Sequence, residues 1–177
     1  MYSGVAGHKL MLGLEWQDNF RVDQRSVDPA DPANNFSISS PGTRAGVYAQ
    51  DEWRIADTLT ATLGLRVDHN SGTGNHTSPR AALIWQAAST TTFKALYGRA
   101  HRAPNAYERD YDDGLGQVGN PALKGESIDT LELVADHRVG SDLQLHAAGY
   151  QWTLRDLLAL GLDPLSGSSP SQSGGAV

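Results

Sequence analysis

The chain passes from one alternating segment to the next through Tyr97-Gly98-Arg99-Ala100-His101-Arg102-Ala103-Pro104-Asn105-Ala106-Tyr107-Glu108 and, after a polar loop, Gly119-Asn120-Pro121-Ala122-Leu123-Lys124-Gly125-Glu126-Ser127. Apolar residues alternate with polar ones on both sides of this crossing, at Phe93, Ala95 and Tyr97 before it and at Leu131 and Leu133 after it. A period of two predicts a β-strand with one apolar face. The crossing is therefore a long connection between two such strands.

The same alternation recurs along the rest of the chain. It predicts strands over about 8–17, 45–54, 59–68, 79–86, 92–99, 127–136 and from Leu143 onward. The alternation becomes irregular at Tyr150 and Trp152, which favours a bulge there, and an eighth strand is expected from Leu157 to Leu162. Polar stretches over 18–44 and 69–78 predict long loops, and short turns separate the other strands. The fold class is thus all-β, an antiparallel meander of seven or eight strands.

Two architectures fit this meander. Strands of about ten residues are long enough to cross a bilayer when tilted, and Trp16, Trp53 and Trp85 lie near strand ends on the apolar side, as in an interfacial girdle. In this case the polar side faces a wet lumen. The alternative is a soluble β-barrel or sandwich that serves as a binding module and has its apolar side inside. Asp51, on the apolar side of its strand, is the residue that fits a lipid-facing surface least well.

Composition excludes several functions. The 177 residues contain no cysteine, which removes disulfides and thiolate chemistry, and the net charge of -6 argues against nucleic acid as a partner. No apolar run is long enough for a membrane helix. Residues 114–119 match GxGxxG but lack the preceding strand and following helix of a phosphate site. We expect no enzyme, cofactor or metal site, and we interpret the acidic residues 110–113 as a solvated loop.

Several motifs, in order, resemble those of TonB-dependent outer-membrane receptors. The crossing resembles the family pattern Y-G-R-x-F-R-A-P-x-x-x-E followed by G-N-P-x-L-K-P-E, with His101 in place of Phe and Gly125 in place of Pro. Further matches are Tyr48-Ala49-Gln50-Asp51-Glu52-Trp53-Arg54, Leu63-Gly64-Leu65-Arg66-Val67-Asp68 and Ser78-Pro79-Arg80. The resemblance covers about residues 8 to 158. It implies the outer membrane of a Gram-negative bacterium and uptake of a scarce metal chelate of the ferric-siderophore type.

The resemblance also sets the expected extent of the domain. Residues 1–165 are expected to form part of a transmembrane barrel of about twenty-two strands, and the Ser/Gly-rich residues 166–177 a flexible tail. The family's plug domain and TonB-binding segment are not recognised in the chain, although both are expected partners of the whole receptor, together with outer-membrane lipid and the chelate. Seven strands alone are expected to form an open, aggregation-prone sheet, because they leave two unpaired edges.

The resemblance supplies the candidate site residues. Glu126 and Glu132 are candidates for contact with arginines of the plug; the alternatives are a solvated loop acid and an ordinary lumen residue. Arg99, Arg102 and Lys124 either brace the crossing or attract an anionic chelate, and bracing is favoured. The remaining motif positions are Pro104, Glu108, Asn120 and Pro121. No histidine lies between Asn105 and Asn120, which argues against haem as the ligand.

Overall fold

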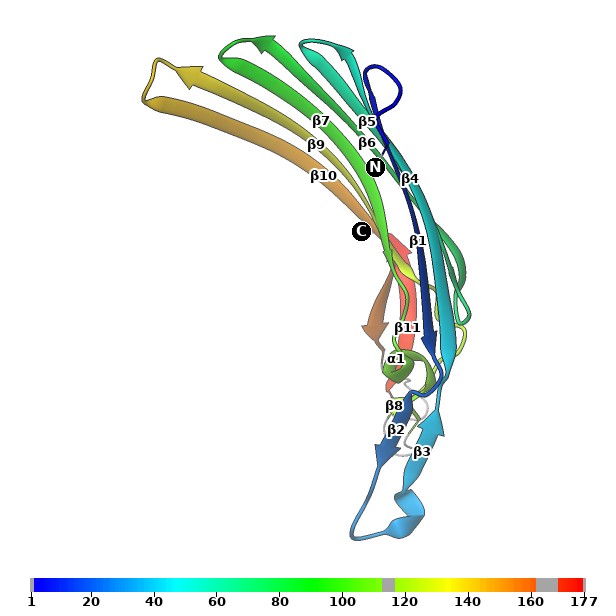
Figure 1. Ribbon diagram of the computed structural model, residues 1–177. Helices are drawn as coiled ribbons and strands as arrows, with labels where there is room; N and C mark the ends of the chain where they lie inside the picture. The colour runs from blue at the N-terminus through cyan, green and yellow to red at the C-terminus, as the bar shows by residue number, and fades with distance from the viewer. Residues whose placement is uncertain (1, 113–116, 162–168, 177) are drawn as a thin grey trace.

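Seven long antiparallel strands form one curved sheet (Figure 1). The structure, a computed structural model, describes residues 2–112, 117–161 and 169–176. The long strands pair in the order β1-β4-β5-β6-β7-β9-β10, which confirms the predicted antiparallel meander. Their bounds are β1 His8–Asn19, β4 Gly42–Ala56, β5 Leu59–Asn70, β6 Gly74–Ala88, β7 Thr91–Arg102, β9 Glu126–Val139 and β10 Leu143–Leu160.

One end of the sheet, the turn rim, carries the tight connections β4–β5, β6–β7 and β9–β10. The register shifts between Arg54 and Ala56 and again between Gln86 and Ala88, so that two of these hairpins contain a bulge beside the turn. Gly140 has a φ of 66° in the β9–β10 turn, a conformation that glycine adopts without steric cost. The short turns predicted from the sequence are therefore present.

The opposite end, the loop rim, differs from the sequence prediction in two places. Residues 18–44 are more than a loop, because they contain the hairpin of β2 (Asp23–Ser26) and β3 (Phe36–Ser39) and the 3-10 turn η1 (Pro32–Asn34). The predicted loop over 69–78 is wrong. Strands β5 and β6 continue through it, pair as far as Asn70 with Gly74, and leave only three residues for the turn. Polar composition there reflects strands that face water on both sides.

β10 runs as one strand through the irregular region. Its pairing with β9 continues without a shift from Leu143 to Arg155, so the bulge expected near Tyr150 and Trp152 is absent there. Of the residues predicted to start an eighth strand, 157–160 extend β10 instead, and Leu162 lies outside the described residues. The Ser/Gly-rich segment, expected to be a flexible tail, contains strand β11 (Ser169–Ala176), antiparallel to the end of β10; β11 also pairs in parallel with the two-residue β8 (Gln117–Val118).

The sheet has two chemically different faces. We call the face with Leu12, Leu63 and Leu133 the outer face, and the face with Arg66 and Glu132 the inner face. The outer leucines are not packed: Leu12, Leu63 and Leu133 are 79%, 62% and 59% exposed. In the described chain only Leu123, Val134, Asp68 and Gly46 are buried, so no hydrophobic core holds the sheet together.

The sheet is open, as the sequence predicts. Six antiparallel pairings separate β1 from β10, so these two strands run in the same direction. Among the described residues, the outer edge of β1 meets only Tyr2, in a bridge to Leu10. Over 143–154, β10 pairs with no described strand on its outer edge.

Candidate functional site

Arg102 is the centre of the crossing at the loop rim. Its Nε donates to Glu126 Oε2 at 2.6 Å, and its two terminal nitrogens donate to the Glu108 carboxylate at 2.9 to 3.1 Å. These contacts join the end of β7, the helix α1 (Ala106–Asp110) and the start of β9. A guanidinium fork suits two carboxylates in this way. Arg102 therefore holds these three segments together and braces the crossing.

The helix α1 begins with reciprocal hydrogen bonds. Glu108 N donates to Asn105 Oδ1 at 2.9 Å, and Asn105 N donates to Glu108 Oε2 at 2.8 Å, which is a capping box. Pro104 precedes the cap. Burial raises the pKa of Glu108, but the hydrogen bonds from Arg102 and Asn105 outweigh burial and leave the pKa below its ordinary value of 4.5. Glu108 therefore stays ionised and serves both the cap and the brace.

The second half of the crossing is a compact turn. Asn120 Oδ1 accepts a hydrogen bond from Ala122 N at 3.0 Å, and Leu123 N donates to the Asn120 carbonyl at 3.1 Å. Pro121 stands between them, where its fixed φ favours a turn. Leu123 is only 3% exposed and anchors the turn, whereas Lys124 is exposed and has no polar partner in the described chain.

Arg99 does not join Arg102. It donates to Asp129 at 2.7 and 3.0 Å, beside Tyr97, whose hydroxyl donates to the same carboxylate at 2.9 Å. Arg155 also contacts Asp129. Tyr97 and Asp129 lie on the outer face, so this cluster is separated from the lumen side of the sheet. The family resemblance grouped Arg99 with Arg102, but the alternation of the strand places them on opposite faces.

The two candidate plug-contact acids are in different states. Glu126 is occupied, since one oxygen accepts from Arg102 and the other from Leu158 N at 2.7 Å. Glu132 lies on the inner face, directly opposite Leu96 on β7 and Tyr150 on β10. It has no polar partner in the part of the chain that the structure describes. Glu132 is therefore the carboxylate left free for a partner.

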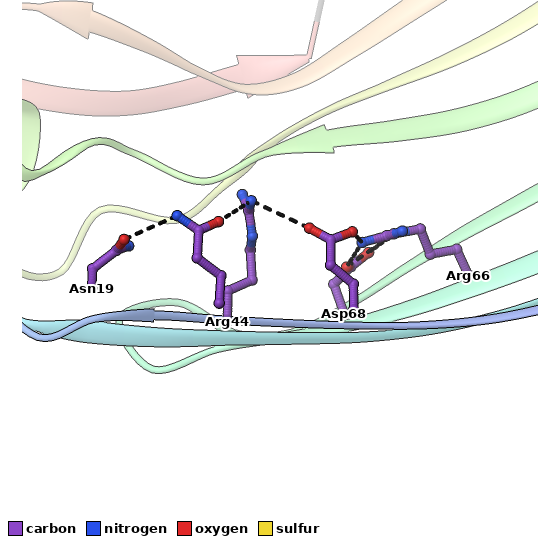
Figure 2. Close-up of polar contacts among 6 residues, drawn as sticks. Asn19, Arg44, Arg66 and Asp68 are labelled. Atoms are coloured by element: carbon purple, nitrogen blue, oxygen red, sulfur yellow. Dashed lines mark hydrogen bonds and ion pairs between the residues drawn. The ribbon is translucent and has the colours of Figure 1, made fainter.

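A ladder of polar side chains crosses the inner face of β1, β4 and β5 (Figure 2). Arg66 donates to Glu15 at 2.8 Å and to Asp68 at 2.6 Å, and Arg44 contacts Glu15 at 3.5 Å and Gln17 at 2.6 Å. Figure 2 shows the side chains of Arg44, Arg66 and Asp68 rising from the same side of the ribbon. The alternation of residues places Arg66 and Glu15 on the polar faces of their strands, but their pairing follows only from the strand register.

Two glycines make room for this ladder. A Cβ at Gly46 would stand 2.6 Å from Asp68 Oδ1 and 2.7 Å from Arg66 Nη2. A Cβ at Gly13 would stand 2.1 Å from the ring of Tyr48, over which the Arg66 guanidinium lies at 6.0 Å. At both glycines a side chain of the inner face therefore packs directly against the backbone.

Two histidines stack near the loop rim. His76 and His101 stack with ring centroids 4.5 Å apart, and His101 Nδ1 lies 3.1 Å from Ser78 Oγ. His101 stands where the family pattern has Phe, and its ring packs against that of His76. The described residues contain no cluster of three or more His, Cys, Asp or Glu that suits a metal ion.

The exposure of the outer face decides between the two architectures. A soluble barrel or sandwich would pack Leu63 and Leu133 inside, yet both are more than half exposed. Asp51, the poor fit on that face, is paired, because its Oδ2 lies 2.7 Å from His8 Nδ1. The His8 ring also stacks on that of Trp53, with the ring centroids 5.5 Å apart. Among the described residues, no helix is long and apolar enough to cross a membrane.

Comparisons with known proteins agree with this arrangement. The chain is 28% identical over 159 residues to the iron-regulated outer membrane virulence protein of Vibrio cholerae, covering 86% of the chain and 23% of the relative. It is also 28% identical over 146 residues to the vitamin B12 transporter BtuB of the same species, covering 82% and 21%. The crystal structure of the siderophore receptor PirA from Pseudomonas aeruginosa superposes with a TM-score of 0.75 at 22% identity, over 96% of the chain and 31% of that structure.

The chain thus spans less than a quarter of the length of these two relatives, and its strands correspond to a segment of a larger barrel. The model of the family described as TonB dependent receptor-like, beta-barrel, matches residues 2–176. We conclude that the chain belongs to the TonB-dependent receptor β-barrel family and is an outer-membrane protein of a Gram-negative bacterium.

Proposed function

We propose that the chain forms part of the wall of a receptor that imports a metal chelate of the ferric-siderophore type. The observation that carries the proposal is the contrast between the two faces of one sheet. The outer face presents exposed leucines to lipid, while the inner face carries the charged ladder around Arg66. A wall of this kind encloses an aqueous path through a bilayer.

The names of the relatives narrow the cargo. They include an iron-regulated protein, a vitamin B12 transporter and a siderophore receptor. Iron siderophores and vitamin B12 are both metals held by large organic ligands, so a metal chelate is the shared class. Because the relatives are receptors and transporters, the proposed activity is transport and not catalysis.

Glu132 is the proposed contact with a plug domain inside the barrel, and TonB is the proposed source of energy. A free carboxylate on the inner face attracts a guanidinium, since a partly buried charge is stabilised by pairing. Replacing Glu132 with glutamine keeps the shape of the side chain and removes its charge. Asp142→Asn is the matched control, because Asp142 is exposed in the β9–β10 turn.

The test is uptake of a radiolabelled ferric siderophore under iron limitation, in the strain that encodes the chain and in a deletion mutant. We expect deletion to abolish the proton-gradient-dependent part of the uptake, Glu132→Gln to reduce it and Asp142→Asn to leave it unchanged. The transport proposal would be refuted if the parent strain and the deletion mutant took up ferric siderophores at the same rate and also took up vitamin B12 at the same rate. A normal rate with Glu132→Gln would refute the role of Glu132 alone.

A further inference from the structure

A polar cavity of about 340 Å³ lies at the loop rim. The ends of β4 and β5 form one side of it, and the first part of the crossing, from Ala103 to Arg109, forms the other. Its polar lining consists mainly of guanidinium, amide and hydroxyl groups, and none of its lining residues in the described chain is acidic. The cavity is separate from Arg102 and Glu132.

Arg109 offers one side of its guanidinium to the cavity. Its Nε and Nη2 donate to Asp110 at 2.9 and 3.1 Å, so its Nη1 has no partner in the described chain. This Nη1 lies over Gly72, at 1.6 Å from where a Cβ would stand. Any other residue at Gly72 would displace the guanidinium, so this glycine admits Arg109 to the β5–β6 turn.

Arg44 contributes a second guanidinium from β4. Its Nη2 is used by Gln17 at 2.6 Å and by Glu15 at 3.5 Å. Its Nε and Nη1 make no hydrogen bond to the described residues. Glu15 and Asp110 thus each occupy part of one guanidinium, and the remaining N–H groups are available as donors.

Two asparagines add donors in a fixed orientation. Asn70 Oδ1 accepts from Gly72 N at 2.8 Å, and Asn105 Oδ1 accepts from Glu108 N at 2.9 Å. Because a backbone N–H can only donate, each amide oxygen is committed to it. The Nδ2 group of each side chain, with its two N–H donors, therefore remains for a ligand.

We propose that this cavity is a binding site for an anionic oxygen group, either a carboxylate or a phosphate. Two guanidiniums and two amide groups with spare donors, with no acid in the lining, favour an acceptor that carries negative charge. The volume is at the lower end of ligand pockets, which suits a small oxyanion or one anionic arm of a larger chelate. The identification of the ligand as one arm of a chelate rests on the proposed transport function, whereas the preference for an oxyanion does not.

The test replaces hydrogen-bond donors of the cavity with acceptors and leaves the fold undisturbed. Asn70→Asp and Asn105→Asp keep the Oδ1 acceptors that the turn and the helix cap need, since aspartate is also a good cap residue, but replace the Nδ2 donors with a charged acceptor. Asn75→Asp is the matched control, because Asn75 is exposed on the outer face of the same β5–β6 hairpin and its Oδ1 contacts His69. Arg109→Gln removes a positive charge independently.

Binding is measured by equilibrium dialysis of outer-membrane vesicles that carry the protein against labelled inorganic phosphate, citrate and ferric citrate, with vesicles lacking it as the blank. We expect Asn70→Asp, Asn105→Asp and Arg109→Gln each to weaken binding by about tenfold or more, and Asn75→Asp to have little effect. Amide exchange at Gly72 and Glu108 shows whether the turn and cap are intact.

The outcomes separate the two proposals. Saturable binding of at least one probe that falls in the donor-inverting variants supports the oxyanion site, even if chelate uptake proves independent of the gene. Binding of ferric citrate adds support for a subsite that holds one arm of a chelate. Binding of phosphate or citrate but not ferric citrate overturns the chelate as the ligand, while the oxyanion site itself remains supported. No saturable binding of any probe, or equal loss in Asn75→Asp, overturns the oxyanion site.

Discussion

Replacing Arg102 with alanine should release the crossing from the sheet. The change removes the hydrogen bonds to Glu108 and Glu126 together. The Arg102 side chain is 46% exposed, while the two carboxylates are 24% and 18% exposed, so solvent weakens each pair. We take about 1 kcal/mol for each carboxylate, between the values for exposed and sheltered charged pairs, or about 2 kcal/mol in total. That corresponds to about a thirtyfold change in the opening equilibrium.

Hydrogen–deuterium exchange measures this opening at two amides. Glu108 N is bonded to Asn105 Oδ1, and Leu158 N is bonded to the Glu126 carboxylate, so both should lose protection by about thirtyfold. Arg138→Ala is the control, because the Arg138 side chain is exposed at the turn rim and makes one long contact, 3.4 Å, to the Ser89 carbonyl. Unchanged protection at both amides in folded Arg102→Ala protein would refute the role of the brace.

Three further predictions concern charge and packing. The depressed pKa of Glu108 contributes stability that is present above its ordinary value of 4.5 and is lost as the pH falls through the lower folded value; acidification should therefore lower the protection factors of amides in the crossing, after correction for the intrinsic exchange rate at each pH, and Glu108→Gln should remove most of this pH dependence. Gly46→Ala should cost about 1–3 kcal/mol in denaturant unfolding because its Cβ meets the Arg66 pair, while Gly98→Ala, with nothing within 4 Å, should be tolerated. Leu63→Arg should cost about 2–4 kcal/mol in lipid, and Thr62→Arg on the inner face far less; equal costs would contradict the assignment of the faces.

The alternation of residues was enough to predict the sheet. Leu10 to Trp16 and Leu59 to Val67 each define a strand and its apolar side, because the side-chain period of a strand is fixed. The prediction failed where both sides of a strand face water, as at the β5–β6 hairpin around Ser71. There polarity no longer alternates, and a strand and a loop have the same composition.

The site was less predictable because its partners come from distant strands. Asp129 and Asp68 were not singled out, yet they hold Arg99 and Arg66. Strand pairing brings such residues together, and a single sequence does not specify the register. The alternation itself offered one missed signal, since it already places Arg99 and Arg102 on opposite faces.

The shared direction of β1 and β10 limits what can complete this sheet. Two copies in the same orientation would meet through parallel strands, and turning one copy over would place its loop rim on the wrong side of the membrane. Barrels of this class close through antiparallel neighbours and even strand numbers. The missing wall must therefore contain an odd number of strands, with its first and last both running from the loop rim to the turn rim. Self-association of the seven strands cannot supply such a wall.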